Sequence, residues 1–169
     1  MISDSQTAAL ERITRYVRTY EAAESSSPID LDRVQRKLEK IFGTVERVPA
    51  REHVYSYSFA VYFDHAYKPI DPELKQKSRF TVIAWLSWIA PFATIQWREN
   101  VTPREAISIR GKELPAQLQE WSSKLERTLV GLGFDVLSEG ILAEIVPGKS
   151  SELDDSPASV FEVLFSAID

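Results

Sequence analysis

The sequence contains no cysteine, two histidines and a single methionine among its 169 residues. Without cysteine the chain cannot form disulfide bonds, thiolate nucleophiles or zinc–thiolate sites. The absence of cysteine is also compatible with a reducing cytoplasm, which is where we expect the protein to act.

Long apolar runs are missing as well. The most apolar stretch, residues 80–97, is interrupted by Pro91 and by polar side chains. A membrane helix needs about 20 predominantly apolar residues, so we expect no membrane span. The N-terminal segment mixes acidic and basic residues where a secretory signal has a basic start and an unbroken apolar run, so we expect no secretory signal.

Familiar catalytic motifs are absent too. The sequence has no GxSxG elbow, and Gly131 and Gly133 lack the strand and the further glycines of a dinucleotide-binding loop. His53 and His65 lie at opposite ends of a predicted strand, too far apart to share a metal ion. Asp64 and His65 could form an acid–base pair, but neighbouring strand residues point to opposite faces. The sequence therefore predicts no catalytic, cofactor or metal site, and a protein that is not an enzyme.

What is present is the composition of a globular domain. Apolar residues make up 44% of the chain and charged residues 27%. A chain of this length forms one domain with one core as the default. We therefore expect residues 1–169 to fold as a single domain.

Residues 1–43 predict an N-terminal pair of amphipathic helices. Apolar residues recur at three- and four-residue spacing in both segments. These residues are Leu10, Ile13, Val17 and Tyr20 in the first helix, and Leu31, Val34, Leu38, Ile41 and Phe42 in the second. Asp30 is placed to cap the second helix, and Gly43 to end it.

Residues 44–98 predict the sheet. Apolar and aromatic side chains alternate with a period of two in residues 53–63, whereas residues 79–89 are apolar on both faces, which predicts a strand buried on two sides. The predicted strands span residues 53–63, 79–89 and 92–98. Residues 64–78 predict a loop, and Pro91 is expected in a turn because proline cannot donate to a central ladder.

The remaining segments predict a long helix followed by closing strands. Leucines at helical spacing mark a helix over residues 113–133. Residues 134–169 predict a short strand, an acidic loop and a last strand in SVFEVLF, while SEGILAEIVPG is compatible with a helix or an extended piece. This order of elements predicts an α+β fold, with an antiparallel β-sheet packed by helices.

Negative charge gathers in the last third of the sequence. The net charge is −5, but residues 113–169 contain three basic and eleven acidic side chains. Such a surface repels nucleic acid and suits a basic protein partner, although acidic residues also serve simply as solvated surface. We predict that Glu152, Asp154 and Asp155 bind a partner. Trp97, near a predicted strand end, is a candidate exposed aromatic anchor.

The second half of the chain resembles immunity proteins of bacterial polymorphic toxin systems. The resemblance covers roughly residues 80–169 and rests on IAWLSWIAPFATIQW, the long helix, EIVPGKSSEL and SVFEVLFSAID. It implies a small cytoplasmic protein that binds and inhibits a cognate toxin domain and has no catalytic residues.

Two other functions stay open at this point. The chain could be a small-ligand-binding protein or an enzyme with a pocket between the sheet and the helix over residues 114–132. It could also be a non-inhibitory adaptor. The first alternative predicts a concave pocket with convergent polar groups, and the second predicts a large flat apolar patch.

Overall fold

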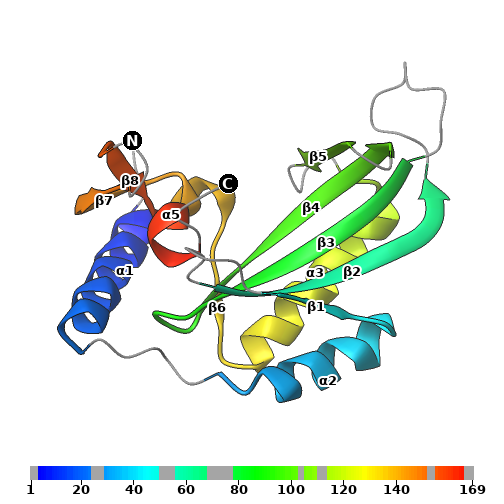
Figure 1. Ribbon diagram of the computed structural model, residues 1–169, viewed down its shortest axis with the longest axis horizontal. Helices are drawn as coiled ribbons and strands as arrows, with labels where there is room; N and C mark the ends of the chain where they lie inside the picture. The colour runs from blue at the N-terminus through cyan, green and yellow to red at the C-terminus, as the bar shows by residue number, and fades with distance from the viewer. Residues whose placement is uncertain are drawn as a thin grey trace.

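An antiparallel β-sheet runs through the middle of the protein, as the computed structural model in Figure 1 shows. Its strands follow the order β1-β2-β3-β4-β5, β6 pairs in parallel with β4, and β7 and β8 form a separate ribbon. The strands are β1 (Glu46–Val48), β2 (Ser56–Tyr67), β3 (Ser78–Ser87), β4 (Phe92–Thr102), β5 (Glu105–Ile109), β6 (Asp135–Val136), β7 (Ile145–Ser150) and β8 (Pro157–Ser159). The helices are α1 (Asp4–Ala23), α2 (Leu31–Phe42), α3 (Ala116–Gly131), α4 (Glu139–Leu142) and α5 (Val160–Leu164).

The structure describes residues 4–23, 29–49, 56–67, 78–102, 105–109, 114–151 and 155–165. Within these ranges, no helix is long and apolar enough to cross a membrane. The mainly antiparallel sheet and the helices packed on it confirm the predicted α+β class.

The second helix, α2, begins and ends as its sequence predicts. The side chain of Asp30 accepts a hydrogen bond of 2.9 Å from the backbone N–H of Arg33, which satisfies one of the free donors at the helix start. Gly43 ends the helix with a positive φ of 80°, a backbone conformation that glycine adopts without strain. Local capping therefore fixes both ends of α2.

The central hairpin joins β3 to β4. Pro91 lies in the turn between these strands, as expected, because the turn does not require its missing N–H. The register places Thr81 opposite Tyr62 of β2 on one side and opposite Arg98 of β4 on the other. Because side chains alternate along a strand, this register decides which residues share each face of the sheet.

Helices α2 and α3 cover one face of the sheet (Figure 1). On α3, the buried residues Leu118, Leu125 and Leu129 share one apolar cluster with Phe80 and Trp97 of the sheet. Burying side chains of this size stabilises the fold by about 1.5–3 kcal/mol each relative to exposure. The space between α3 and the sheet is thus filled by side chains.

A second apolar cluster holds α1, α4, β7, β8 and α5 together in what we call the C-terminal lobe. Its fully or almost fully buried members are Ile13, Val17, Ala90, Phe92, Leu137, Val146, Val160, Leu164 and Phe165. The two helices predicted in residues 1–43 are both present, and they pack in different places, because α1 joins this lobe whereas α2 packs on the sheet. The apolar stripe on each helix predicts that this side of the helix is buried, but it does not predict which element packs against it.

The last apolar run corrects a second expectation. SVFEVLF was predicted as a strand, but its greater part forms the helix α5. Ser159 and Glu162 make a capping box, in which each side chain accepts a hydrogen bond from the other residue's backbone N–H. The apolar residues of a run this short fit either period, and the capping box decides for the helix.

Three further segments differ from the sequence prediction or complete it. Residues 105–109, within a polar stretch, form β5 and pair with β4. Strand β2 extends to Tyr67, into the predicted loop, and residues 68–77 lie outside the described part of the chain. SEGILAEIVPG contains both expected forms, the short helix α4 and the start of β7.

Candidate protein-binding surfaces

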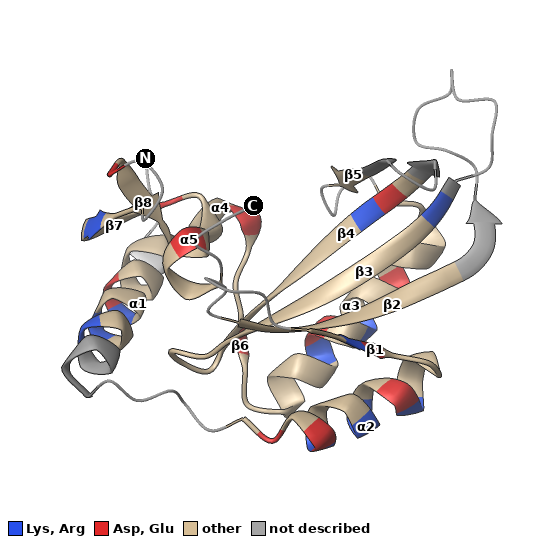
Figure 2. Cartoon of the chain, viewed as in Figure 1, with Lys and Arg blue, Asp and Glu red and all other residues tan. Residues whose placement is uncertain are grey.

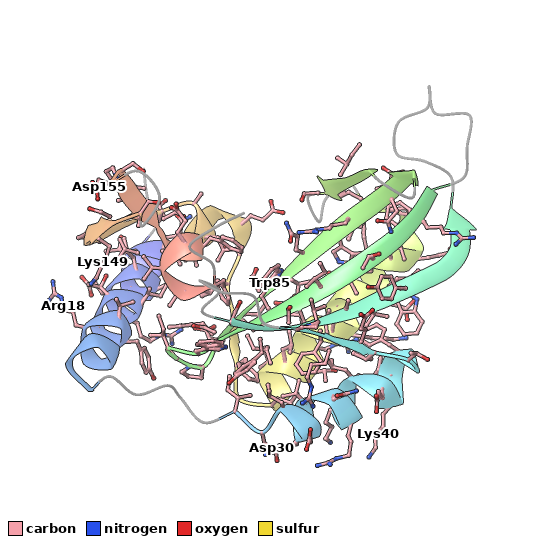
Figure 3. The ribbon with its side chains drawn as sticks, in the orientation of Figure 1. Arg18, Asp30, Lys40, Trp85, Lys149 and Asp155 are labelled. Carbon is pink, nitrogen blue, oxygen red and sulfur yellow. The ribbon has the colours of Figure 1, made fainter. Side chains whose placement is uncertain are left out.

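The structure describes Asp155 alone among the three acidic loop residues predicted to bind a partner. Glu152 and Asp154 lie outside the described residues. Asp155 is exposed, with a positive φ of 58°, and its backbone N–H donates to the carbonyl of Ser151 at 3.2 Å. Figure 3 places it at the end of the C-terminal lobe that is farthest from the sheet. The position is free to contact another molecule.

Trp97 is buried, so the expectation that it is an exposed anchor is wrong. Its side chain is 2% exposed and packs against Phe63 at 5.4 Å between ring centroids. Its indole Nε1 donates to the hydroxyl of Ser122 on α3 at 3.1 Å. The strand continues to Thr102, so Trp97 occupies the middle of β4 and faces the helices instead of ending the strand in solvent.

The acidic side chains of the last third divide between two parts of the molecule. Glu120 and Glu126 lie on α3, and Asp135 pairs with Arg12. In the C-terminal lobe, the described residues between positions 139 and 165 carry a single basic side chain, Lys149. Their acidic side chains are Glu139, Glu144, Asp155 and Glu162. Figure 2 shows them on α4, α5 and the β7–β8 end of the lobe. The acidic surface is therefore smaller than the acidic third of the sequence.

Among the described residues, the sheet face opposite α2 and α3 is covered at one end only. There Trp85 contacts Phe161 of α5 at 6.1 Å between rings, and the hydroxyl of Ser56 donates to the carbonyl of Phe165 at 2.7 Å. Figure 3 shows Trp85 where the sheet meets the C-terminal lobe. Beyond it, no helix of the described residues lies over this face (Figure 1).

We call this part the uncovered sheet face. Its side chains are Tyr62, Thr81, Ile83, Gln96, Arg98, Asn100 and Ser108, together with Glu46 and Arg79 at its edges. One row crosses four strands directly, from Tyr62 through Thr81 and Arg98 to Ser108. Thr81 is small and buried, whereas Tyr62 beside it is 55% exposed. The row thus places a large aromatic ring and an arginine on either side of a short side chain.

Hydrogen bonds hold the polar side chains of this face in place. The guanidinium of Arg98 donates to the amide oxygen of Gln96 at 3.2 Å, and the amide nitrogen of Gln96 donates to the hydroxyl of Ser108 at 3.1 Å. Asn100 donates to the hydroxyl of Thr81 at 2.8 Å. Side chains fixed in this way lose less conformational entropy when a partner binds.

Tyr62 gives a measurable property of this face. A hydrogen bond to Glu46 and partial burial raise the pKa of Tyr62 above its usual value. Because the folded state favours the neutral phenol, this contribution to stability is present below pH about 10 and is lost as the pH rises through the raised pKa. We expect Glu46→Gln to lower the pKa of Tyr62, measured by ultraviolet titration of each protein minus its Tyr62→Phe counterpart. An unchanged pKa in Glu46→Gln contradicts the contact.

The candidate metal ligands and catalytic residues considered in the sequence fall partly outside the described residues. No group of three or more histidine, aspartate or glutamate side chains among them could hold a metal ion. His53 lies outside the described residues, as do the side chains of Asp64 and His65. A groove of about 730 Å³ follows α1 beside Pro147, and it does not lie between the sheet and α3 as the ligand-pocket alternative predicts. That interface is filled by the buried leucines of α3.

Sequence reasoning missed the uncovered sheet face, although a signal for it was present. In TIQWREN, the polar residues Gln96, Arg98 and Asn100 occupy every second position, and Trp97 lies between two of them. This alternation is typical of a strand with one face buried and one face available to solvent or a partner. No protein-family model, curated protein or solved structure matches the chain.

Proposed function

We propose that the protein is a non-catalytic immunity protein that binds and inhibits a toxin domain through the acidic surface of its C-terminal lobe. The observation that carries the proposal is the charge of residues 139–165 within this lobe, where the described residues hold four acidic side chains and one lysine, whereas Arg12, Arg15 and Arg18 of the same lobe lie on α1. The resemblance of residues 80–169 to immunity proteins gives the partner its class.

The packing of the lobe supports a binding role. Val160 and Leu164 of α5 and Ile13 of α1 are fully buried in one cluster, which holds the acidic surface in a fixed arrangement. A rigid surface binds with a smaller loss of conformational entropy than a mobile one. Complementary charge accelerates the encounter with a basic partner and fixes its orientation. A basic catalytic cleft of a toxin domain would meet both conditions.

The direct test uses candidate toxin domains, starting with any that is encoded by a gene next to that of this protein. We expect co-expression of the two proteins to restore the growth of bacteria that the toxin domain arrests. The purified proteins should form an equimolar complex in size-exclusion chromatography, without turnover of the inhibitor. Growth arrest in the presence of the folded protein, together with two separate elution peaks, would contradict the proposal.

Reversing the charge of the lobe should slow association. We expect the variant with Glu139→Lys, Glu144→Lys and Asp155→Lys to bind the toxin domain about tenfold more slowly at low salt, because it removes the attraction that steers the encounter. Stopped-flow fluorescence measures the rate, and its dependence on salt should also weaken.

A matched control changes the net charge equally at another site. Glu39→Lys, Glu120→Lys and Glu126→Lys place the same charges on α2 and α3, on the opposite side of the sheet. This control should slow association much less. Equal effects in the two variants would show that net charge, and not the lobe, governs the encounter.

A further inference from the structure

The uncovered sheet face carries positive charge that no described carboxylate neutralises. Arg98 and Arg79 both lie on this face, and the register places them on a diagonal across β3 and β4. Glu46, the acidic residue described on the same face, lies on the edge strand β1, where it accepts the hydrogen bond from Tyr62 of β2. Like charges on neighbouring strands repel each other, and an anionic partner would relieve this repulsion.

A hydrogen bond holds the side chain of Arg98 in place, but no carboxylate of the described residues pairs with it. Among the described residues its one hydrogen-bond partner is the amide of Gln96, and its Nε is buried without an acceptor. A desolvated donor without an acceptor costs about 1–3 kcal/mol in folded proteins. The guanidinium has five N–H donors in a planar fork, so several remain for another molecule. A carboxylate matches this fork better than any other protein group.

Neighbouring side chains define how the carboxylate would arrive. Thr81, which is buried and small, lies directly between Tyr62 and Arg98 in the row across the sheet. Ile83, one pair along the strands, adds an apolar side chain beside Gln96. A segment crossing this face can therefore place an acidic side chain against Arg98 and an apolar or aromatic group beside Tyr62 and Ile83.

The geometry points to Arg98 as the anchor for an aspartate or glutamate side chain of the toxin domain. This inference rests on the proposed function and adds a second contact to it, of opposite sign to the acidic C-terminal lobe. Two contacts of opposite charge at separate places accept a partner in one orientation only, because the reversed orientation brings like charges together.

The test uses calorimetry to measure the affinity of three variants for the toxin domain identified by co-expression. We expect Arg98→Met to weaken binding about 30-fold, as removal of one partner of a desolvated ion pair does. Arg98→Lys should also bind less tightly than the wild type, because it keeps the charge but loses the fork. The matched control is Arg36→Met, which removes an exposed arginine from α2 on the other side of the sheet and should bind like the wild type.

Thermal unfolding of the free protein separates binding from a structural role. Because Arg98 has an unsatisfied donor, we expect the Tm of Arg98→Met to equal or exceed that of the wild type. A fall larger than about 4 °C would make Arg98 a structural residue and overturn the inference.

The remaining outcomes distinguish the two proposals. If Arg98→Met binds the toxin domain as tightly as the wild type does, the role of Arg98 is overturned and the proposed function stays intact. No complex with the wild-type protein overturns both. If the free wild-type protein is a dimer and the free Arg98→Met variant is a monomer, a second copy of the chain occupies this face. That outcome also overturns the inference.

Discussion

The free energy of unfolding is expected to fall by about 3–5 kcal/mol when Phe92 is replaced by alanine. Phe92 begins β4 and is 1% exposed within the cluster of the C-terminal lobe. Its ring contacts Tyr16 edge to face at 5.5 Å, and the guanidinium of Arg12 lies 5.5 Å from its centroid. Alanine removes all of these contacts and leaves a cavity at the point where the sheet joins α1.

Urea unfolding followed by circular dichroism measures this loss. The matched control is Ile107→Ala, which also shortens an apolar side chain on an outer part of the sheet but at a position that is 55% exposed. We expect the control to lose less than about 1 kcal/mol, because little area is withdrawn from water there. Similar losses in the two variants would mean that Phe92 does not join the lobe to the sheet.

Replacing Trp97 by alanine is expected to cost a similar amount, about 3–5 kcal/mol. Its ring fills the layer between β4 and the helices, against Phe63 and near the α3 residue Ser122. Trp97→Phe keeps most of the apolar ring and loses the hydrogen bond to Ser122, so we expect a loss of about 1–2 kcal/mol. The order of the two variants follows from the volume that each removes.

Measurements on the free protein distinguish this core role from an interface role. An exposed aromatic anchor contributes to binding, and its removal leaves the stability of the unbound protein nearly unchanged. We expect the opposite for Trp97→Ala, namely a large loss of stability in the absence of any partner. A variant with phenylalanine at the other tryptophans isolates the fluorescence of Trp97. Quenching of this fluorescence by acrylamide in the folded variant would contradict the burial of Trp97.

Sequence patterns were sufficient where one local rule decides the structure. Asp30 and Gly43 mark the ends of α2 because capping and positive φ involve only neighbouring residues. The strands β3 and β4 follow from alternation, and Pro91 from the hydrogen bond that it cannot donate. In each case the controlling interaction lies within a few residues of the chain.

Predictions failed where distant segments decide the outcome. The sequence predicted α1 and α2 but not the cluster that each one joins, which depends on the apolar surface left uncovered after the sheet has formed. β5 is a five-residue strand within a mainly polar stretch, and it pairs with the edge of β4, which offers unpaired backbone groups. The capping box of Ser159 and Glu162 was visible in the sequence, but the apolar run after it suggested a strand.

Of the two candidate surfaces, the acidic one was expected from the sequence and the uncovered sheet face was not, because the latter depends on distant segments. Acidic residues can be counted along the chain, so the negative charge of the C-terminal lobe could be anticipated. The row from Tyr62 to Ser108 could not, because its residues come from four strands and meet only through the register. Trp97 was misassigned because residue type alone does not show which face of a strand is buried.

The C-terminal lobe combines α1, the first described helix, with α5, the last one. During synthesis, α1 leaves the ribosome long before Val146 and Leu164, the residues that bury its apolar side. The sheet and its covering helices can assemble in the meantime. The surface proposed to neutralise a toxin is therefore the last part to be completed, and a truncated chain would lack it while keeping most of its sheet.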